Sequence, residues 1–444
     1  MTHATPTYAT LEDWIAREAR AFSLDDPQSF ATAVDQMLAL PGEQVELLGL
    51  GEAFHGGAGF LTLRNRLFQY LVQAHGYSAI ALESSFPQGQ LVNEYVAGRG
   101  PASYEQIQQS GFSHNFGKLE ENQELVEWMR QYNADPTHAV KLRFYGFDSP
   151  TDNVDGADSP RQVLHVALDY LTSIDKASGQ RHRSRIEPLL GQDATWQNPY
   201  ALIDPAQSIG LSAEATALRI ETEELISDLL IRRPELVAQS GPDRYREALQ
   251  YALEARQLLN YHAELAGTSD ERIARLLGIR DMMMADNLAY IVAHERSRGK
   301  VLAFAQNAHL GRGKAQMQFG PAVHAWWPAG AQLNEMFGPR YVVIGSAVGV
   351  SEATGIGQPE TGTLENLLTA APGPARLIPT HRGQGLPASE LASLPTRSGS
   401  TKHPGYFMLT SHSLADFDWL AVLDSTPYSR GGPPLFNMNP DPTP

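Results

Sequence analysis

Acid and base side chains follow the ends of several stretches of the sequence that we expect to be buried strands. Glu52 and His55 lie in the segment GEAFHGG, directly after the first of these stretches, and Glu83 follows the second. Asp148 follows a third, and His309 lies close behind a fourth. In open α/β sheets, chemistry takes place beyond the carboxyl ends of the parallel strands. We therefore expect these side chains to converge on one cleft.

The chemistry that this set favours is general acid–base catalysis. An unperturbed histidine has a pKa of about 6.5, which suits His55 to take a proton from water at neutral pH. A neighbouring carboxylate could orient its ring and stabilise the imidazolium, as the acid of a catalytic triad does. Arg64 or His309 could then stabilise a developing oxyanion. Glycines flank His55 and would let the backbone turn sharply there, namely Gly51, Gly56, Gly57 and Gly59.

Other chemistries have weaker support. The chain has no cysteine, which excludes thiolate nucleophiles, thiolate metal sites and disulfides. It has no G-x-S-x-G segment, so the usual mark of an α/β-hydrolase serine is missing. The same carboxylates and imidazoles are plausible ligands for zinc, manganese or iron, but no H-E-x-x-H pattern groups them. We therefore predict direct attack by water, without a metal ion or another cofactor.

Each of these residues also has a structural interpretation. Any one of the fourteen histidines is more often a surface or packing residue than a catalytic one. Glu83 could cap a helix, and Asp148 could fix a turn. The coincidence at four strand ends, and not any single residue, favours the functional interpretation. Structural roles are predicted for His75, His114, His294, His324 and His412.

The elements that must hold these residues alternate between strands and helices. Residues 45–51 form an apolar run that ends on glycine, residues 60–75 have one apolar helical face, and residues 78–82 form the next apolar run. A strand, a helix and a strand in this order predict a right-handed βαβ unit with parallel strands. Two helical segments within residues 11–40 precede it. Further strands are expected at 140–147, 301–305, 341–344 and 420–423.

The rest of the chain divides into helical and loop segments. Residues 155–298 are almost wholly helical in pattern, which is too much helix for one crossover. We expect an α/β fold with a central, mostly parallel sheet flanked by helices, in which residues 1–150 and 276–444 form the catalytic core. Residues 151–275 would form a helical insertion or cap over the cleft at the strand ends. Little regular structure is expected in two segments: residues 352–404, rich in Gly, Pro, Ser and Thr, and a mobile tail from Pro427.

The composition fits a globular enzyme that acts on a small molecule. The 444 residues are 42% apolar, enough for a sizeable core. The net charge of −16 disfavours nucleic acid and anionic membranes as partners, because both attract clustered positive charge. No apolar run approaches the roughly 20 residues that cross a bilayer, and the N-terminus lacks the pattern of a signal peptide. We therefore expect a cytoplasmic protein, and its oligomeric state stays open.

The segments that carry these residues resemble the erythromycin esterase family. The most specific is GEAFHG at 51–56, which is followed by Arg64 and Glu83 at separations typical of the family. The resemblance spans nearly the whole chain, and the helical insertion is its least diagnostic part. Its other segments are NQELVEWMRQYN at 122–133, FYGFDSP at 144–150, RDMMMADNL at 280–288, QNAHLGR at 306–312 and YVVIGSAVG at 341–349.

The resemblance implies a role for each matching residue. In the family, the histidine of the G-E-x-x-H motif is the proposed base that activates water against a lactone ester, and His55 matches it. Glu52 and Glu83 match the two acids, and Arg64 matches the arginine of the following helix. His309 matches the second histidine of an H-N-x-H segment. Known members open macrolide rings without an obligatory cofactor, on a sheet flanked by helices with an extra helical part over the cleft.

Two positions depart from the pattern of the family. Gln306 replaces the first histidine of the H-N-x-H segment, and an amide can form hydrogen bonds but cannot shuttle a proton near pH 7. Phe54 stands before His55, where the family often has a small side chain, and its ring would narrow the site or offer an apolar wall. With Asp148, these two residues are the predicted substrate contacts.

The leading hypothesis is a cofactor-independent hydrolase in which water activated by His55 attacks an ester or lactone of a macrolide- or polyketide-like substrate. Glu52 and Glu83 would set the tautomer and charge of the ring. Arg64 and His309 would polarise the carbonyl group. The alternative is a biosynthetic dehydratase, lyase or cyclase that acts on a polyketide-like intermediate, which the missing family histidine favours. A non-catalytic binding protein is a third possibility, and the complete set of acid and base residues argues against it.

Overall fold

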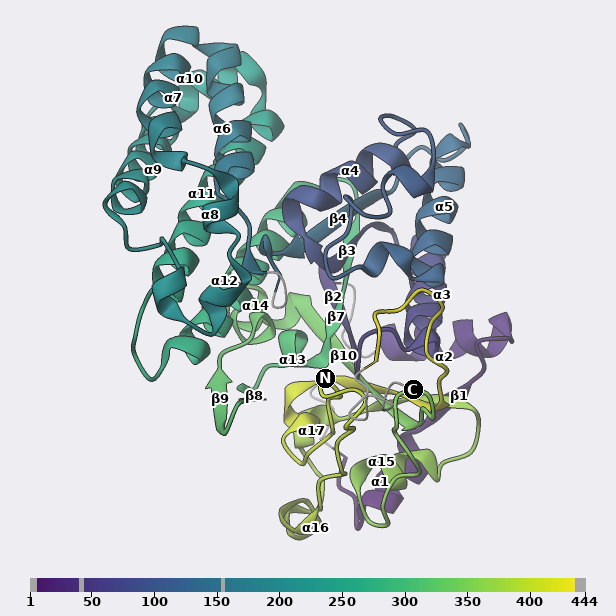
Figure 1. The fold of residues 1–444 in the computed structure, drawn as a ribbon. Coiled ribbons are helices and arrows are strands. Elements are labelled where there is room, and N and C mark those ends of the chain that lie inside the picture. The colour runs from purple at the N-terminus through teal and green to yellow at the C-terminus, as the bar shows by residue number, and fades with distance from the viewer. Residues whose placement is uncertain (1–5, 40–43, 153–155, 436–444) are drawn as a thin grey trace, which may run out of the picture.

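An eight-stranded, mostly parallel sheet forms the centre of the protein (Figure 1). The computed structural model describes residues 6–39, 44–152 and 156–435. The sheet and its flanking helices confirm the expected α/β class. In spatial order the strands are β1 (Arg20–Phe22), β11 (Ala375–Pro379), β12 (Trp419–Ser425), β10 (Tyr341–Val350), β2 (Leu47–Glu52), β7 (Lys300–Gln306), β3 (Tyr77–Ser85) and β4 (Arg143–Asp148).

One edge of this sheet is antiparallel, which differs from the prediction for residues 352–404. β11 pairs antiparallel with β12, and the three-residue strand β1 pairs antiparallel with β11. Loops were expected here, but the segment contains β11 as well as the short helices α15 (Leu364–Thr369) and α16 (Ala388–Ser393). All five residues of β11 are buried, so the strand has no alternation of polar and apolar residues that would mark it.

The predicted strand–helix–strand unit is present, but its two strands are not neighbours. β2 and β3, joined by α3 (Ala58–Ala74), both pair parallel with β7, which lies between them. β7 comes from much later in the chain, so the local sequence gives no sign of this insertion. As a result the carboxyl ends of β2, β7 and β3 are adjacent, and they bring Glu52, Gln306 and Glu83 to the same edge of the sheet.

The two faces of the inner strands carry side chains of different size. The small side chains face one long helix, α12 (Arg272–Glu295), which packs across β3, β4 and β7. This close approach lets α12 deliver its own polar side chains to the strand ends. On β3 and β7 the small and large sets are Ala79, Ala81, Ala303 and Ala305 against Ile80, Leu82, Leu302 and Phe304.

The predicted helical segment forms a bundle at one side of the sheet (Figure 1). The division of the chain into a core and a helical insertion that ends at residue 275 remains a prediction. Helix α12 extends across that boundary. In the described ranges no helix is both long and apolar enough to span a bilayer. The bundle consists of α6 (Arg161–Ile174), α7 (Lys176–Leu190), α8 (Asp193–Trp196), α9 (Ala213–Ile231), α10 (Arg233–Ser240), α11 (Pro242–Leu265) and part of α12.

The remaining elements cover the sheet or border the strand ends. The face with the large side chains is packed against α2 (Pro27–Ala39), α3, α4 (Phe86–Val96) and α5 (Glu120–Ala134). The other elements are α1 (Leu11–Glu18), α13 (Asn307–Leu310), α14 (Ala329–Phe337), α17 (Ser413–Asp416) and the two small hairpins β5 (Thr151–Asp152)–β6 (Gly156–Ala157) and β8 (Ala315–Phe319)–β9 (Ala322–Trp326).

A buried amide fixes the turn that follows β7. The Nδ2 atom of Asn307 donates to the carbonyl oxygen of Ser346 at 2.8 Å, and its Oδ1 accepts from the N–H of Ser346 at 2.9 Å. A Cβ atom on Gly51 would come within 2.3 Å of that Oδ1, so this position of β2 requires glycine. The two bonds tie the end of β7 to β10 and thereby hold α13, which carries His309, at the edge of the sheet.

Replacing Asn307 by alanine should destabilise the fold. The change leaves the N–H and C=O of Ser346 buried without partners, so we expect the free energy of unfolding to fall by about 2–4 kcal/mol. Urea unfolding followed by circular dichroism measures this loss. Gln316→Ala, on the exposed part of β8, is the control and should change stability by no more than about 0.5 kcal/mol. Equal, small effects of the two changes would contradict the role of the amide.

Candidate active site

His55 and Glu52 form a hydrogen-bonded pair in the loop that follows β2. The Nδ1 atom of His55 lies 2.7 Å from Oε1 of Glu52, and 29% of the His55 side chain is exposed. When Nδ1–H donates to the carboxylate, Nε2 keeps a lone pair that can accept a proton. The loop turns sharply at Gly56, which has a φ of +78° and leaves only 2.7 Å between a Cβ atom and the ring of Tyr428.

The carboxyl group of Glu52 is enclosed by protein. Burial raises its pKa, and the hydrogen bond and charge of His55 oppose this rise. Its Oε2 atom is buried and has no hydrogen-bond partner within the part of the chain that the structure describes. An ionised Glu52 therefore gains most of its stabilisation from the His55 ring, and it favours a positive charge there.

Glu83 lies at the centre of the cluster. Its Oε1 atom is 3.0 Å from Nη2 of Arg280, 3.3 Å from Nε2 of His309 and 3.8 Å from Nε2 of His55. Its Oε2 atom accepts the backbone N–H of Gln306 at 2.8 Å. Burial alone would raise the pKa of Glu83, but the neighbouring His309 and the other cations hold it well below its usual value. Glu83 is therefore an ionised acceptor at neutral pH.

Asp148 and Arg280 form a buried ion pair next to Glu83. The Nε atom of Arg280 donates to Oδ1 of Asp148 at 2.9 Å, and its Nη2 donates to Oδ2 at 2.5 Å. Burial would raise the pKa of Asp148, but the guanidinium group outweighs it and lowers the pKa. Asp148 is completely buried, so its expected contact with substrate is not favoured. Its role in this structure is to hold Arg280 against Glu83.

His309 is held between two acids. Its Nδ1 atom lies 2.9 Å from Oδ1 of Asp281, on α12, and its Nε2 faces Glu83. Asp281 also accepts the indole N–H of Trp326 at 2.5 Å and the backbone N–H of Ala329 at 2.9 Å. Burial lowers the pKa of His309, but Asp281 and Glu83 outweigh it and raise the pKa to about 10. The two acids therefore favour a protonated ring, and Nη1 of Arg280 also lies 3.2 Å from Nε2 of His309.

His114 joins this cluster, although we predicted a structural role for it. Its Nε2 atom lies 3.1 Å from Oδ2 of Asp148. The ring of Phe116 lies between the two histidine rings, with centroid distances of 5.3 Å to His114 and 5.1 Å to His55. His114 and Asn115 have φ values of 57° and 59°, which are uncommon for residues other than glycine. No pattern in the sequence marks His114, because it lies in a loop and not after a strand.

Arg64 donates its hydrogen bonds to groups outside the cluster, although its charge still acts on Glu52. Its Nη1 atom donates to Asn122 at 2.7 Å and its Nη2 donates to Asn65 at 2.7 Å, with the guanidinium group 5.0 Å above the ring of Phe304. Burial lowers the pKa of Arg64 to about 10. Its position on the buried face of α3 explains the difference, and it gives no support to the predicted contact with a substrate carbonyl. The cation next to the acids is instead Arg280.

Phe54 and Gln306, the other two predicted substrate contacts, lie in different surroundings. Phe54 is fully buried, and its ring packs edge-on against Phe60 and Tyr406, so it offers no wall to a substrate. His55, the next residue of this loop, is instead partly exposed. Gln306 is half-buried, and its Nε2 atom donates to the carbonyl oxygen of Gly405 at 2.6 Å.

The beginning of the C-terminal tail covers the His55 loop, so the expectation of a mobile tail from Pro427 is wrong for the described residues up to 435. The N–H of Ala58 donates to the carbonyl oxygen of Pro427 at 3.0 Å, and the N–H of Ser429 donates to that of Gly56 at 2.7 Å. The hydroxyl of Ser429 also donates to Glu121. These bonds hold the tail in place despite its loop-like composition. Residues 436–444 lie outside the described residues.

One group of these side chains has the geometry of ligands for a metal ion. In the described ranges, ligand atoms of Glu83, His114 and Asp148 all lie within 4.8 Å of one another. The guanidinium group of Arg280 contacts both carboxylates, so it already supplies the positive charge that they require. A cation would have to displace this buried ion pair.

The fold and the clustered side chains define an α/β protein with histidines and carboxylates gathered at the strand ends. The sequence pattern of the family described as erythromycin esterase matches residues 72–426. The chain therefore belongs to the erythromycin esterase family, which confirms the resemblance seen in the sequence. Membership of this family supports an esterase-like hydrolase.

Two relatives from Escherichia coli are similar over most of the chain. The type II erythromycin esterase is 24% identical over 344 residues, which cover 75% of this chain and 76% of the relative. The type I enzyme is 23% identical over 297 residues, which cover 65% of this chain and 67% of the relative.

Solved structures share the fold over nearly the whole chain. A protein from Bacillus cereus has a TM-score of 0.71 at 19% identity and covers 94% of this chain and 98% of its own. A succinoglycan biosynthesis protein has a TM-score of 0.68 at 19% identity, with 94% and 97% covered. A mutant of the erythromycin esterase EreC in its open conformation has a TM-score of 0.66 at 20% identity, with 93% and 98% covered.

The charge on His309 should appear as a pH dependence of stability. Its pKa of about 10 in the folded protein lies above the ordinary value of about 6.5, so its proton stabilises the fold below about pH 6.5 and this contribution is lost as the pH rises towards 10. We expect the stability difference between the wild type and His309→Gln to shrink over that window. Urea unfolding at several pH values measures it.

His262 provides a control of opposite sign. Burial lowers the pKa of His262 to about 4, so its contribution to stability is present above about pH 6.5 and is lost as the pH falls towards 4. The stability difference for His262→Gln should therefore stay constant in the alkaline window. A constant difference for His309→Gln as well would contradict the raised pKa of His309.

Proposed function

We propose that the protein is a hydrolase that opens an ester or lactone with water activated by His55. The observation that supports this most is the pair formed by His55 and Glu52, in which Nδ1 is engaged at 2.7 Å and the other ring nitrogen remains available. The partly exposed ring lies beside buried charged groups. An imidazole in this setting is suited to general base catalysis near neutral pH.

In the proposed reaction, His55 moves one proton twice. Nε2 takes a proton from water as the water oxygen bonds to the carbonyl carbon, and the ring becomes an imidazolium ion stabilised by Glu52. When the tetrahedral intermediate breaks its bond to the leaving oxygen, the imidazolium returns the proton to that alkoxide. The products are a carboxylic acid and an alcohol, or a hydroxy acid when the substrate is a lactone.

The buried acids and cations would orient the water and balance the charge. Glu83 lies 3.8 Å from Nε2 of His55, close enough to accept a hydrogen bond from a water molecule that also contacts the ring. His309 and Arg280 keep Glu83 ionised, so that it acts as an acceptor and not as a competing acid. Arg64 is turned into the core, so the cations beside Glu83 that would balance a developing oxyanion through space are Arg280 and His309.

The proposed substrate is a small molecule, a macrolide- or polyketide-like ester or lactone. The reaction would take place in the cytoplasm and would use no metal ion or other cofactor. Support comes from the family and from the two relatives, which are named as erythromycin esterases. A panel of macrolides, followed by mass spectrometry for the gain of one water, tests this class directly.

Replacing His55 by alanine should abolish turnover and leave the fold intact. Loss of a general base lowers the rate by about 10²–10⁴-fold, whereas removal of a partly exposed ring has little effect on packing. The rate is followed by mass spectrometry on whichever panel member reacts, and the melting temperature by circular dichroism.

His165→Ala is a matched control for that experiment. His165 lies in the helical bundle, its side chain is 31% exposed, and its Nε2 atom contacts Glu187 at 2.9 Å. Its loss should leave both the rate and the melting temperature close to those of the wild type. If His55→Ala loses stability and activity in parallel, its role is structural and the proposal fails.

Labelled water separates hydrolysis from the alternative of a dehydratase, lyase or cyclase. In H₂¹⁸O, hydrolysis incorporates one ¹⁸O atom into the carboxyl group of the product, because water is the nucleophile. Elimination or cyclisation needs the same base but incorporates no label. Mass spectrometry of the product distinguishes the two. A product without label, formed at a rate that depends on His55, would favour the alternative, which the amide at Gln306 motivates.

A further inference from the structure

Residues 400–407 form a strap across the loop that carries His55. The backbone N–H of Phe407 donates to the carbonyl oxygen of Ala53 at 2.7 Å. Four residues earlier in the strap, the Nε2 atom of His403 lies 3.1 Å from the carbonyl oxygen of His55 itself. The strap is thus bonded to the residue of the proposed base and to the residue two positions before it.

Hydrogen bonds within the strap fix the backbone around His403. The hydroxyl oxygen of Ser400 accepts the N–H of Lys402 at 3.2 Å and the N–H of His403 at 3.1 Å. The same hydroxyl donates to the carbonyl oxygen of Thr354. On the other side, the N–H of Tyr406 donates to the carbonyl oxygen of His403 at 3.0 Å. The position of the His403 ring is therefore set by a braced turn.

The surroundings of the His403 ring favour one arrangement of its hydrogens. Its Nδ1 atom is buried and has no hydrogen-bond partner among the described residues, whereas Nε2 faces the carbonyl oxygen of His55. A hydrogen on Nδ1 would be a buried donor without an acceptor, which is costly. Burial lowers the pKa of His403, and the charge of His55 lowers it further. The neutral ring, with its hydrogen on Nε2, therefore donates to the carbonyl oxygen of His55.

The His403 ring is also held by packing. Its centroid lies 5.2 Å from that of Phe54 and 6.4 Å from that of Tyr428, with edge-on geometry in both pairs. A Cβ atom on Gly405 would lie 3.6 Å from Nε2 of Gln306 and 3.7 Å from the His403 ring, so these two side chains flank the same glycine. The residue in which this chain departs from the family thus braces the strap next to His403.

We propose that His403 is a positioning residue for the proposed hydrolase. Its hydrogen bond fixes the backbone of His55, so that the His55 ring stays 2.7 Å from the carboxylate of Glu52. His403 acts through His55 and takes no part in proton transfer to the substrate. The inference rests on the proposed function of His55 as the base.

Two substitutions of His403 separate its hydrogen bond from its packing. Phenylalanine keeps an aromatic ring without a donor, whereas the amide N–H of glutamine can reach the position of Nε2. On whichever macrolide of the panel reacts, His403→Phe should lower kcat by about 10- to 100-fold, because a displaced base reacts poorly. KM should change by less than about threefold, since substrate binding is not affected. His403→Gln should keep kcat within about threefold of the wild type.

The titration of the His55 ring, followed by NMR, gives a readout that does not depend on turnover. A ring displaced from Glu52 loses the carboxylate that stabilises its cation. The midpoint of the titration should therefore move to lower pH by about 0.5–1 unit in His403→Phe and stay in place in His403→Gln. The carboxylates that face the ring, Glu52 and Glu83, are the same in all variants. His55→Ala assigns the signal.

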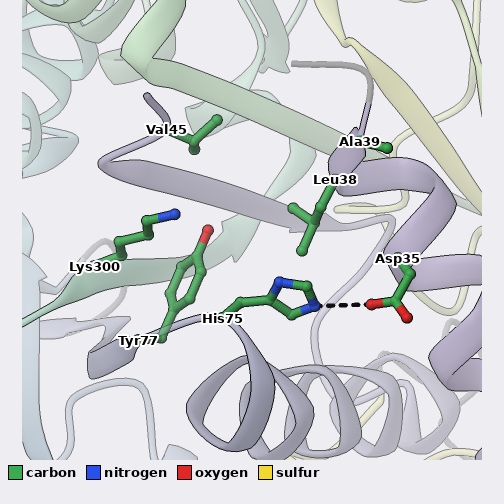
Figure 2. Close-up of a pocket in the computed structure, with 7 residues that line it drawn as sticks. All are labelled: Asp35, Leu38, Ala39, Val45, His75, Tyr77 and Lys300. Carbon is green, nitrogen blue, oxygen red and sulfur yellow. Dashed lines mark hydrogen bonds and ion pairs between the residues drawn. The ribbon is translucent and has the colours of Figure 1, made fainter. Parts of the chain in front are cut away.

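His75→Phe is the matched control (Figure 2). His75 is also a partly exposed histidine, and its Nε2 atom contacts Asp35 at 2.9 Å while its ring packs edge-on against Tyr70. It precedes β3, so it lies at the opposite end of the sheet from the clustered side chains. This change should leave both kcat and the titration of His55 as in the wild type.

The proposal is overturned if His403→Phe keeps the rate and the His55 titration of the wild type. It is also overturned if His403→Gln loses them to the same extent as His403→Phe. If the wild type turns over no macrolide of the panel, the proposed macrolide hydrolysis fails, and the NMR titration alone decides whether His403 positions the His55 ring. His403→Leu, which also lacks a donor, replaces His403→Phe if that variant does not fold.

Discussion

The arrangement of the strand ends depends on the balance of buried charge around Glu83. Three carboxylates from different elements, Glu83, Asp148 and Asp281, are almost completely removed from water. An isolated buried carboxylate is very costly, so the cluster requires cations in direct contact. Arg280 and His309 supply them, each bridging two of the acids. Removing either cation would leave an unpaired charge in the interior, so these groups position one another and leave His55 as the partly exposed member.

The sheet makes this balance possible through the size of its side chains. Arg280 and Asp281 both come from α12, which must lie close to β3 and β7 to bring them to the strand ends. Alanines on that face of the two strands permit the close approach. A larger residue there would lift the helix and separate the cation from Glu83. The ion pairs of the site therefore depend on the small side chains of the core.

Residues with a local pattern could be predicted from the sequence, and residues whose roles arise from distant packing could not. The long apolar runs predicted the strands. Because parallel strands end at one edge of the sheet, they also predicted that the acid and base residues at the strand ends would lie close together. His114 escaped detection because its loop shows no periodicity. Arg64 was assigned to the site from its distance along the chain, but it lies on the same helical face as Leu63 and Leu67, which is buried. The strand β11, which lies next to the edge strand β1, was missed because its five buried residues show no alternation.

Gln306 stands where the family has a histidine, but this difference has little effect on the geometry of the site. The contact of this residue with Glu83 is made by the backbone N–H at 2.8 Å, which any side chain except proline preserves. Its amide instead holds the loop at Gly405, and the same part of the chain contacts His55, because Nε2 of His403 lies 3.1 Å from the His55 carbonyl oxygen. The side chain thus supports the loop that packs on the proposed base. Loss of a titratable group here removes one proton carrier, while the pair formed by His55 and Glu52 keeps its geometry.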